Sequence, residues 1–277
     1  MAGMVCGAPV EELPGCTVED VREAWSRIAP LWSRYVRSGR DVHRDLLHGP
    51  ALLEACGDVN GLRALDIGCG EGWAGREVAS RGASVVGLDI SGEMIEEARS
   101  HPFQADQQID YRVMDAADAH RYLADPAFDL VIACMSLHDM ADPGAVLHSV
   151  RRVLKDDGRL VFSIPHPLTH MAGGRQLHRL GDDALYFRAA NYFQSAPYRI
   201  DWQQPAGEAW RTLRWSRPLG EYVGLLKDAG FVVYGQIEPH HSRADVEMHQ
   251  RLRNASEIPS HLVFVAGPVP RRTSSTG

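Results

Sequence analysis

The sequence predicts an α/β protein built around a mostly parallel sheet. Two observations support this fold class. From about residue 58, short apolar runs alternate with longer amphipathic runs, and the first apolar run ends in a glycine-rich turn, ALDIGCGEGW at 64–73. Such alternation is typical of βαβ units, in which helices join successive parallel strands. We expect seven strands, at 63–67, 84–88, 110–114, 130–134, 159–164, 231–237 and 261–266.

Composition narrows the class of protein. A chain of 277 residues can bury one well-packed domain with an elaboration. Its 44% hydrophobic and 23% charged residues are ordinary for a soluble protein, and no run approaches the roughly 18 apolar residues of a membrane span. The first 16 residues lack the basic start and apolar stretch of a secretory signal. We therefore expect a cytoplasmic protein with no membrane partner.

Charge and cysteine usage exclude further classes. The formal net charge of -7 disfavours nucleic acid as a partner, because binding phosphates requires clustered lysine and arginine. The five cysteines are odd in number, widely spread and without a C-x-x-C pair, which disfavours disulfides and a zinc site. The oligomeric state is left open by these observations.

Two helical stretches precede the sheet. The segment TVEDVREAWSRIAPLWSRYVR begins at a capping Thr17 and spaces its apolar residues three and four apart, as in an amphipathic helix, with a kink expected at Pro30. A second helix is expected over 46–55. We assign 1–16 to a flexible tail, 17–57 to a helical cap, 58–267 to the main domain and 268–277 to a second flexible tail.

A long insertion follows the fifth strand. About fifty residues after position 164 show no helical period, and a connection of that length is usually functional. The stretch 166–216 holds 8 of the 21 aromatic residues and six arginines against four acids, and QQPAG predicts a hairpin turn within it. We interpret it as a lid for an acceptor that is aromatic or apolar and carries a carboxylate or phosphate; a satellite core under a long loop is an equal alternative.

Three successive strands end in an acidic residue. Asp66 precedes the glycine turn, Asp89 follows 19 positions after Gly70, and Asp115 ends the third strand. A carboxylate at the second position suits ribose hydroxyls, and one at the third suits an adenine amino group. A dinucleotide fingerprint would need a third glycine where Trp73 stands, which disfavours NAD. The alternative is that these acids are helix N-caps.

The motifs LDIGCGEG, VVGLDIS, VMDAAD, FDLVIACMSLHDM and LKDDGRLVFSIPHP together resemble those of the class I S-adenosylmethionine (SAM)-dependent methyltransferases. The resemblance runs from about 61 to 167 and resumes at LLKDAGFVV and IEP. It implies a Rossmann-like sheet whose last of seven strands is antiparallel, SAM as cofactor and S-adenosylhomocysteine as product. The cofactor-binding residues that it implies, with one aromatic from the cap, are Tyr35, Asp66, Gly68, Cys69, Gly70, Asp89, Ile90, Met94, Asp115, Ala116 and Met135.

Histidines follow the fourth and fifth strands. Methyl transfer is an in-line displacement, so positioning supplies much of the catalysis and a base is optional. If the acceptor loses a proton, His138 or His166 is placed to remove it, although a histidine in such a loop is more often structural. The spacing of His166 and His170 could suit a metal, but no further ligand accompanies them, so none is expected. The expected acceptor-binding residues are His138, His166, His170, Tyr192 and Phe193.

The sequence thus predicts methyl transfer from SAM to a small molecule, in specialised metabolism. Two alternatives remain. One is methylation of a macromolecule such as tRNA or protein by the same fold, which salt-dependent substrate binding would reveal. The other is a SAM-binding protein without turnover, because a fold does not determine an activity.

Overall fold

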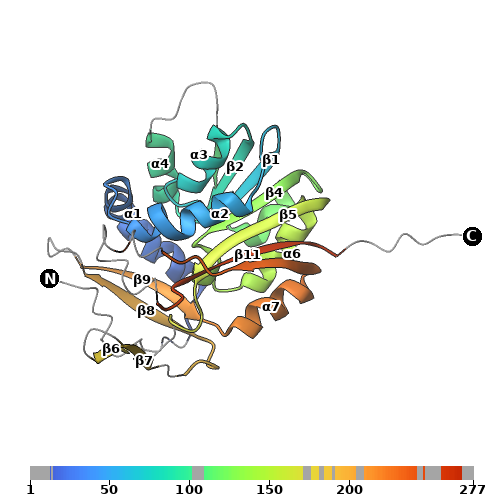
Figure 1. The fold of residues 1–277 in the computed structure, drawn as a ribbon. Coiled ribbons are helices and arrows are strands. Elements are labelled where there is room, and N and C mark those ends of the chain that lie inside the picture. The colour runs from blue at the N-terminus through green and yellow to red at the C-terminus, as the bar shows by residue number, and fades with distance from the viewer. Residues whose placement is uncertain are drawn as a thin grey trace, which may run out of the picture.

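The computed structural model of the chain is an α/β/α arrangement around a seven-stranded sheet (Figure 1). It describes residues 15–101, 109–170, 191–202, 210–241 and 257–269, the single positions 13 and 246, and the backbone at 176–180, 184–188, 203 and 209. Most of the expected tails at 1–16 and 268–277 lie outside the described residues. The boundaries drawn for cap, domain and tails stay predictions.

Strands of the main sheet fall where the sequence predicts them. They are β1 (Arg63–Ile67), β2 (Ser84–Asp89), β3 (Asp110–Val113), β4 (Phe128–Cys134), β5 (Leu154–Pro165), β10 (Phe231–Ile237) and β11 (His261–Pro268). Their order is β10-β11-β5-β4-β1-β2-β3, and β11 is antiparallel to both neighbours while the other pairs are parallel. This confirms the expected sheet. β5 begins earlier than predicted, because Leu154 already pairs with Phe128.

Helices cover both faces of the sheet. One face carries α2 (Gly49–Ala55), α3 (Trp73–Ser80) and α4 (Gly92–Ser100), and the other α5 (Ala119–Tyr122), α6 (Pro143–Val153) and α7 (Leu219–Asp228). Side chains of β1 alternate between the faces: Ala64 joins the core under α2 and α3, whereas Leu65 and Ile67 join the core under α6. With both faces buried, parallel strands read as continuous apolar runs, as they do here.

The cap begins with α1 (Val18–Arg37). Thr17 and Asp20 form a capping box, in which each side chain bonds the other residue's backbone N–H. Pro30 lies inside this helix, which continues on both sides of it, so the expected kink does not divide the element. The second expected helix is divided instead: a π-helical turn at Arg44–His48 leads into α2.

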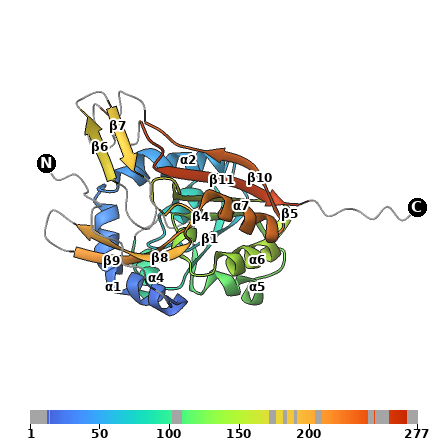
Figure 2. The same ribbon diagram turned by 90° about the horizontal axis from the view of Figure 1, so that it is seen from below.

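The insertion after β5 contains the expected hairpin. It consists of β8 (Ala196–Gln203) and β9 (Ala209–Ser216), whose register places Trp202 opposite Trp210. A second hairpin, β6 (Gln176–Leu180) with β7 (Ala184–Arg188), was not predicted, because QLHRL and ALYFR do not alternate strictly. α1 packs against β9, and Figure 2 shows both beside each other at one end of the molecule. Within the described residues no helix is both long and apolar enough to cross a membrane.

Candidate functional site

The glycine-rich turn forms an open cradle after β1. Gly68 and Gly70 have φ angles of 62° and 56°, in the left-handed region that favours glycine. A Cβ on Gly68 would lie 2.5 Å from the Cβ of Ser136, so the turn and the end of β4 are in close contact. A Cβ on Gly70 would meet no described atom within 4 Å. The backbone at Gly70 therefore faces a space that a ligand can use.

Asp89 closes this cradle from β2. Its Oδ2 accepts the N–H of Gly70 at 2.8 Å and its Oδ1 the N–H of Ser91 at 2.9 Å. Burial raises the pKa of this carboxyl to about 6. Each carboxylate oxygen has a further lone pair, so Asp89 can hold the turn and still accept ligand hydroxyls. The cap of α4 is Ser91, which accepts from the N–H of Met94, so Asp89 is not that helix's N-cap.

Two further acids lie near Asp89 at the rim, which is the edge of the sheet where β1 to β5 end. Their surroundings differ from those of Asp89. Asp66 is 1% exposed, its carboxyl faces Gly75 of α3, and burial raises its pKa to about 7. Asp115 accepts the N–H of Ala117 at 2.9 Å and caps a 3-10 turn at Ala116–Asp118. One carboxylate oxygen of Asp115 therefore acts as an N-cap, as the alternative interpretation expected. Asp66 is the second-last residue of β1 and Asp115 lies just after β3, and both of these strands pair with β2.

The end of β4 has an unusual backbone. Met135 has a φ of 53°, rare for a residue other than glycine, and its N–H donates to both the carbonyl and the hydroxyl of Ser163 at 3.1 Å. The hydroxyl of Ser136 donates to the carbonyl of Ile67 at 2.7 Å. Strained backbone held by several bonds is typical of functional sites. These bonds bring β4 against the cradle.

Glu71 links the cradle to the cap. It is 4% exposed and lies 2.6 Å from Arg76 of α3, 3.5 Å from Arg37 of α1 and 3.6 Å from Arg44 of the π-helical turn. Nearby, the hydroxyl of Ser26 on α1 lies 2.9 Å from that of Ser91. These contacts set α1 beside the rim, whereas Tyr35 turns to the lid: its hydroxyl donates to the carbonyl of Arg40 and its ring packs on Trp210 at 5.5 Å.

His138 lies in a 3-10 turn after β4. It is 2% exposed, its Nε2 lies 3.1 Å from Oδ1 of Asp139, and burial holds its pKa well below the usual range. Asp139 is itself 5% exposed, with a pKa raised to about 6 by burial, and Arg214 of β9 donates to it at 3.3 Å. His138 is thus a neutral imidazole beside a buried ion pair. Neither of its ring nitrogens has a hydrogen-bond partner of good geometry among the described residues, so its contact with Asp139 is electrostatic.

His166 is engaged at both ring nitrogens. Its Nδ1 accepts the N–H of Leu168 at 3.2 Å, which leaves the proton on Nε2, 2.9 Å from the carboxylate of Glu238. In this arrangement neither nitrogen is left for a substrate proton. Of the two candidate bases, His138 fits the role better.

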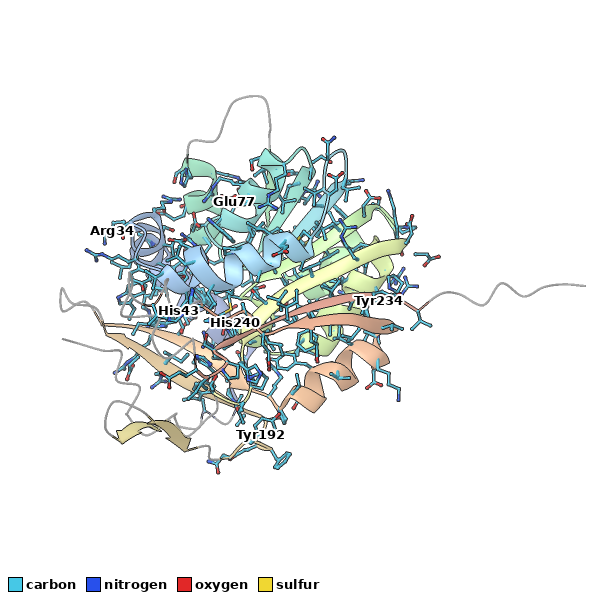
Figure 3. The ribbon with its side chains drawn as sticks, in the orientation of Figure 1. Arg34, His43, Glu77, Tyr192, Tyr234 and His240 are labelled. Carbon is cyan, nitrogen blue, oxygen red and sulfur yellow. The ribbon has the colours of Figure 1, made fainter. Side chains whose placement is uncertain are left out.

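The remaining expected acceptor residues separate into two places. His170 lies beside His261, with ring centroids 6.1 Å apart, and lines a small hollow with His138. Tyr192 instead accepts the N–H of Leu219 at the start of α7, and Phe193 is 89% exposed. Figure 3 places Tyr192 at the bottom of the molecule, far from His43 of the cap. The structure does not bring Tyr192 and Phe193 to the other site residues.

Several buried polar residues of this region were missed by sequence reasoning. His48 and His261 pack their rings 4.7 Å apart, yet they come from the cap and the last strand, so no local pattern links them. Asp139 lies in the motif FDLVIACMSLHDM and Glu71 in LDIGCGEG, so their place in these motifs could have marked them as site residues.

Burial raises the pKa of the Cys69 thiol, which makes it a poor nucleophile.

A wider hollow lies at the opposite end of the parallel strands, away from the cradle. It measures about 430 Å³ and is lined by residues from α6, α7 and the loop before β4, including Arg151, Arg152 and Asp228. Its arginines pair with Asp156 and Asp125. Because open α/β sheets bind ligands at the carboxyl ends of their strands, we place the site at the cradle and not in this hollow.

The sheet order, the glycine cradle and the acidic strand ends define a class I SAM-dependent methyltransferase fold. Residues 65–162 match the family described as Methyltransferase domain, so this part of the chain carries a methyltransferase domain.

Curated relatives match part of the chain. A ubiquinone biosynthesis O-methyltransferase from Klebsiella pneumoniae subsp. pneumoniae is 33% identical over 137 residues, 49% of this chain and 56% of that protein. One of the same description from Alkalilimnicola ehrlichii is 34% identical over 115 residues, 40% of this chain and 45% of its own. The chain thus spans about half the length of the curated relatives it matches.

Solved structures match more of the chain. An S-adenosylmethionine-dependent methyltransferase from Mesorhizobium loti superposes with a TM-score of 0.66 at 27% identity, over 79% of this chain and 96% of that one. A protein from Listeria monocytogenes superposes with a TM-score of 0.61 at 24% identity, with the same coverage, and supports the fold alone.

Proposed function

We propose that this protein transfers a methyl group from SAM to a small-molecule acceptor with an aromatic or apolar body. The observation that carries the proposal is the cradle, where open backbone at Gly70 and a buried carboxylate at Asp89 face the same space. That pairing suits a ligand with a ribose and a charged amino acid part. The Mesorhizobium loti protein, described as SAM-dependent, supports the same cofactor.

Each part of the rim has a role in this proposal. Asp89 accepts ribose hydroxyls, Ala116 and Asp115 border the adenine, and Gly68, Cys69 and Gly70 leave room for the methionine part, while Ile90 and Met94 supply apolar contact. Bound SAM supplies an electrophilic methyl group and leaves as S-adenosylhomocysteine. Met135 and His138 stand where the acceptor's nucleophilic atom would arrive, and the cap and the lid hairpin exclude water.

His138 is the proposed base. A hydroxyl or amine acceptor must lose a proton as its bond to the methyl carbon forms, and a neutral imidazole can take it. The buried carboxylate of Asp139, 3.1 Å away, stabilises the imidazolium that results. The O-methyltransferase description of the curated relatives favours a hydroxyl as the acceptor group. A role in specialised metabolism is part of the proposal.

Methylation of a macromolecule is the second candidate function. The net charge of -7 and the enclosed position of His138 favour a small acceptor over tRNA or a folded protein. A methyl-transfer assay with labelled SAM against hydroxylated aromatic acids, bulk tRNA and cell protein separates these outcomes. We expect label in the small-molecule fraction; label in tRNA alone would replace the proposal.

Asp89→Ala tests the cofactor site. We expect S-adenosylhomocysteine affinity to fall by roughly 1.5–3 kcal/mol, the usual value for hydrogen bonds to a charged group. Isothermal titration calorimetry measures the change. Asp110→Ala is the matched control, because that carboxylate is exposed at the start of β3 and pairs with Arg112. Equal affinity in wild type and Asp89→Ala would remove Asp89 from the site.

His138→Ala tests the base. Turnover should fall on the order of a hundredfold while S-adenosylhomocysteine affinity is retained, and the remaining rate should lose its dependence on one titrating group. His166→Ala should lower the melting temperature more than the rate, because its bond to Glu238 is lost. The exposed His148 on α6 provides the control variant. A wild-type rate in His138→Ala would leave positioning as the mechanism.

A further inference from the structure

Four histidines and one arginine from distant parts of the chain meet beside the proposed acceptor position. We call them the histidine–arginine cluster: His48, His138, His170, His261 and Arg214. The cap contributes His48, the strands β9 and β11 contribute Arg214 and His261, and the loops after β4 and β5 contribute the other two. Figure 3 labels His43 of the cap near the β8–β9 hairpin, and its ring lies 5.4 Å from that of His261 in the cluster.

Hydrogen-bonding capacity in this cluster is left unused by the protein itself. His48 is 3% exposed and His138 is 2% exposed. In the described part of the chain, the Nδ1 atoms of both find no hydrogen-bond partner. A buried polar atom without a partner is destabilising, so such atoms are retained where a ligand satisfies them.

Positive charge accompanies these imidazoles. Arg214 is 8% exposed, and its Nε lies 3.3 Å from Asp139, a long contact for a bond between opposite charges. Arg217, 6% exposed, donates to the backbone carbonyls of Met140 and Ala141. Arg217 is also paired with Glu221 at 3.5 Å, which leaves Arg214, whose contact with Asp139 is long, as the guanidinium that a ligand can engage. Burial keeps His48, His138 and His261 neutral, so they are hydrogen-bonding groups rather than cations.

The space beside these groups is small. A hollow of about 10 Å³ is lined by His138, His170, Arg214 and Trp215, with Pro165 and Pro167 on one side. That is close to the volume that one water oxygen needs. It therefore admits an oxygen atom of a ligand group and not a ring, whose place is outside the hollow.

We propose that the histidine–arginine cluster is the subsite that recognises a carboxylate, or a similarly small anionic oxygen group, on the acceptor. The inference rests on the proposed function. Arg214, which lines the hollow, supplies the charge, and the neutral imidazole of His48 in the same cluster supplies an N–H donor, whereas His138 keeps an unprotonated nitrogen for its role as the base. A metal is the less suitable ligand, because within the described residues no three His, Cys, Asp or Glu side chains are arranged to hold one.

Benzoate and its neutral isostere benzamide test the subsite. With the protein saturated by S-adenosylhomocysteine, calorimetric titration should show benzoate binding at least about tenfold more tightly than benzamide, as expected for a charged hydrogen bond. Arg214→Met should abolish that preference and leave S-adenosylhomocysteine affinity unchanged. Arg211→Met is the matched control on the same strand, because Arg211 is exposed and pairs with Asp201.

Arg214→Met leaves Asp139 buried without its partner, which is destabilising. The double variant Arg214→Met/Asp139→Leu removes both charges and should also lose the preference for benzoate while staying folded. Inorganic phosphate that competes with benzoate in wild type, and not in either variant, supports the same site for a phosphate group.

Three results overturn the subsite. They are equal binding of benzoate and benzamide, no binding of either probe, and an unchanged preference in a folded Arg214 variant. Failure to bind S-adenosylhomocysteine at all would instead contradict the proposed function, so the two failures are distinguishable.

Discussion

The two halves of the rim are built in different ways. The proposed cofactor half, at the ends of β1, β2 and β3, consists of short local motifs whose backbone N–H groups and carboxylates bond each other, as Gly70 and Asp89 do. The proposed acceptor half, at the ends of β4 and β5, depends on side chains from five distant segments, including His48 and Arg214. The first half is encoded by neighbours in the sequence, and the second is assembled only by folding.

This difference suggests which half tolerates change. A turn that depends on backbone conformation has few alternatives in sequence, because only glycine adopts its φ angles without strain. A cluster of side chains can be replaced piece by piece and can thus be adapted to a different acceptor. The variants below test the contrast, from the largest expected effect to the smallest.

Gly68→Ala and Gly70→Ala should separate folding from binding in the cofactor half. Both cost about 1–2 kcal/mol for the left-handed backbone. Gly68→Ala adds roughly 1–3 kcal/mol of crowding against Ser136, so its free energy of unfolding should fall most. The Cβ of Gly70→Ala meets no described atom within 4 Å, so this variant should mainly weaken S-adenosylhomocysteine binding. Denaturant unfolding and calorimetry give the two quantities; the opposite order of stabilities would contradict the cradle.

The two halves should respond oppositely to pH. The folded pKa of Asp66 is raised to about 7, so the native state binds more protons than the unfolded state and its contribution is lost as pH rises from about 4 to 7. The folded pKa of His48 is lowered to about 3, so its contribution grows as pH rises from about 3 to 6.5. Each slope is at most about 1.4 kcal/mol per pH unit.

Asp66→Asn and His48→Phe measure these slopes. Between about pH 5 and pH 6.5, the stability of Asp66→Asn relative to wild type should rise by ~2 kcal/mol, and that of His48→Phe should fall by a similar amount. The free energy of unfolding of the ligand-free protein at both pH values provides the test. If the stability of both variants relative to wild type changed in the same direction with pH, burial would shift the two pKa values in the same sense with respect to stability, and the contrast between the halves would fail.

Phe193→Ala should have the smallest effect. The side chain is 89% exposed and packs only edge-on against Tyr192, with centroids 5.1 Å apart, among the described contacts. The Michaelis constant for the acceptor and the melting temperature should both stay near their wild-type values. A severalfold rise in the Michaelis constant would restore Phe193 to the acceptor half and show that the lid rearranges on binding.

The first half could be recognised from the sequence and the second could not, because local bonds determine the one and packing of distant segments determines the other. A strand that ends in Asp89, one βα unit after a glycine turn, can be recognised from a few consecutive letters, because bonds within and between adjacent elements determine its geometry. By contrast, Tyr192 and Phe193 were assigned to the acceptor site from aromatic content alone. Aromatic content does not show which way a side chain points. The structure places Tyr192 at the start of α7 and leaves Phe193 exposed beside Tyr192.

What the sequence by itself determined is the sheet, its strand boundaries to within a few residues, the β8–β9 hairpin and the glycine turn after β1, because periodicity and turn chemistry are local properties. Only the tertiary structure decided which polar groups are buried together. It directed His166 toward Glu238 and left His138 beside Asp139, and it brought His48 and His261 into ring contact across more than two hundred residues of chain. Such contacts depend on how helices and strands pack, and no short stretch of sequence specifies that.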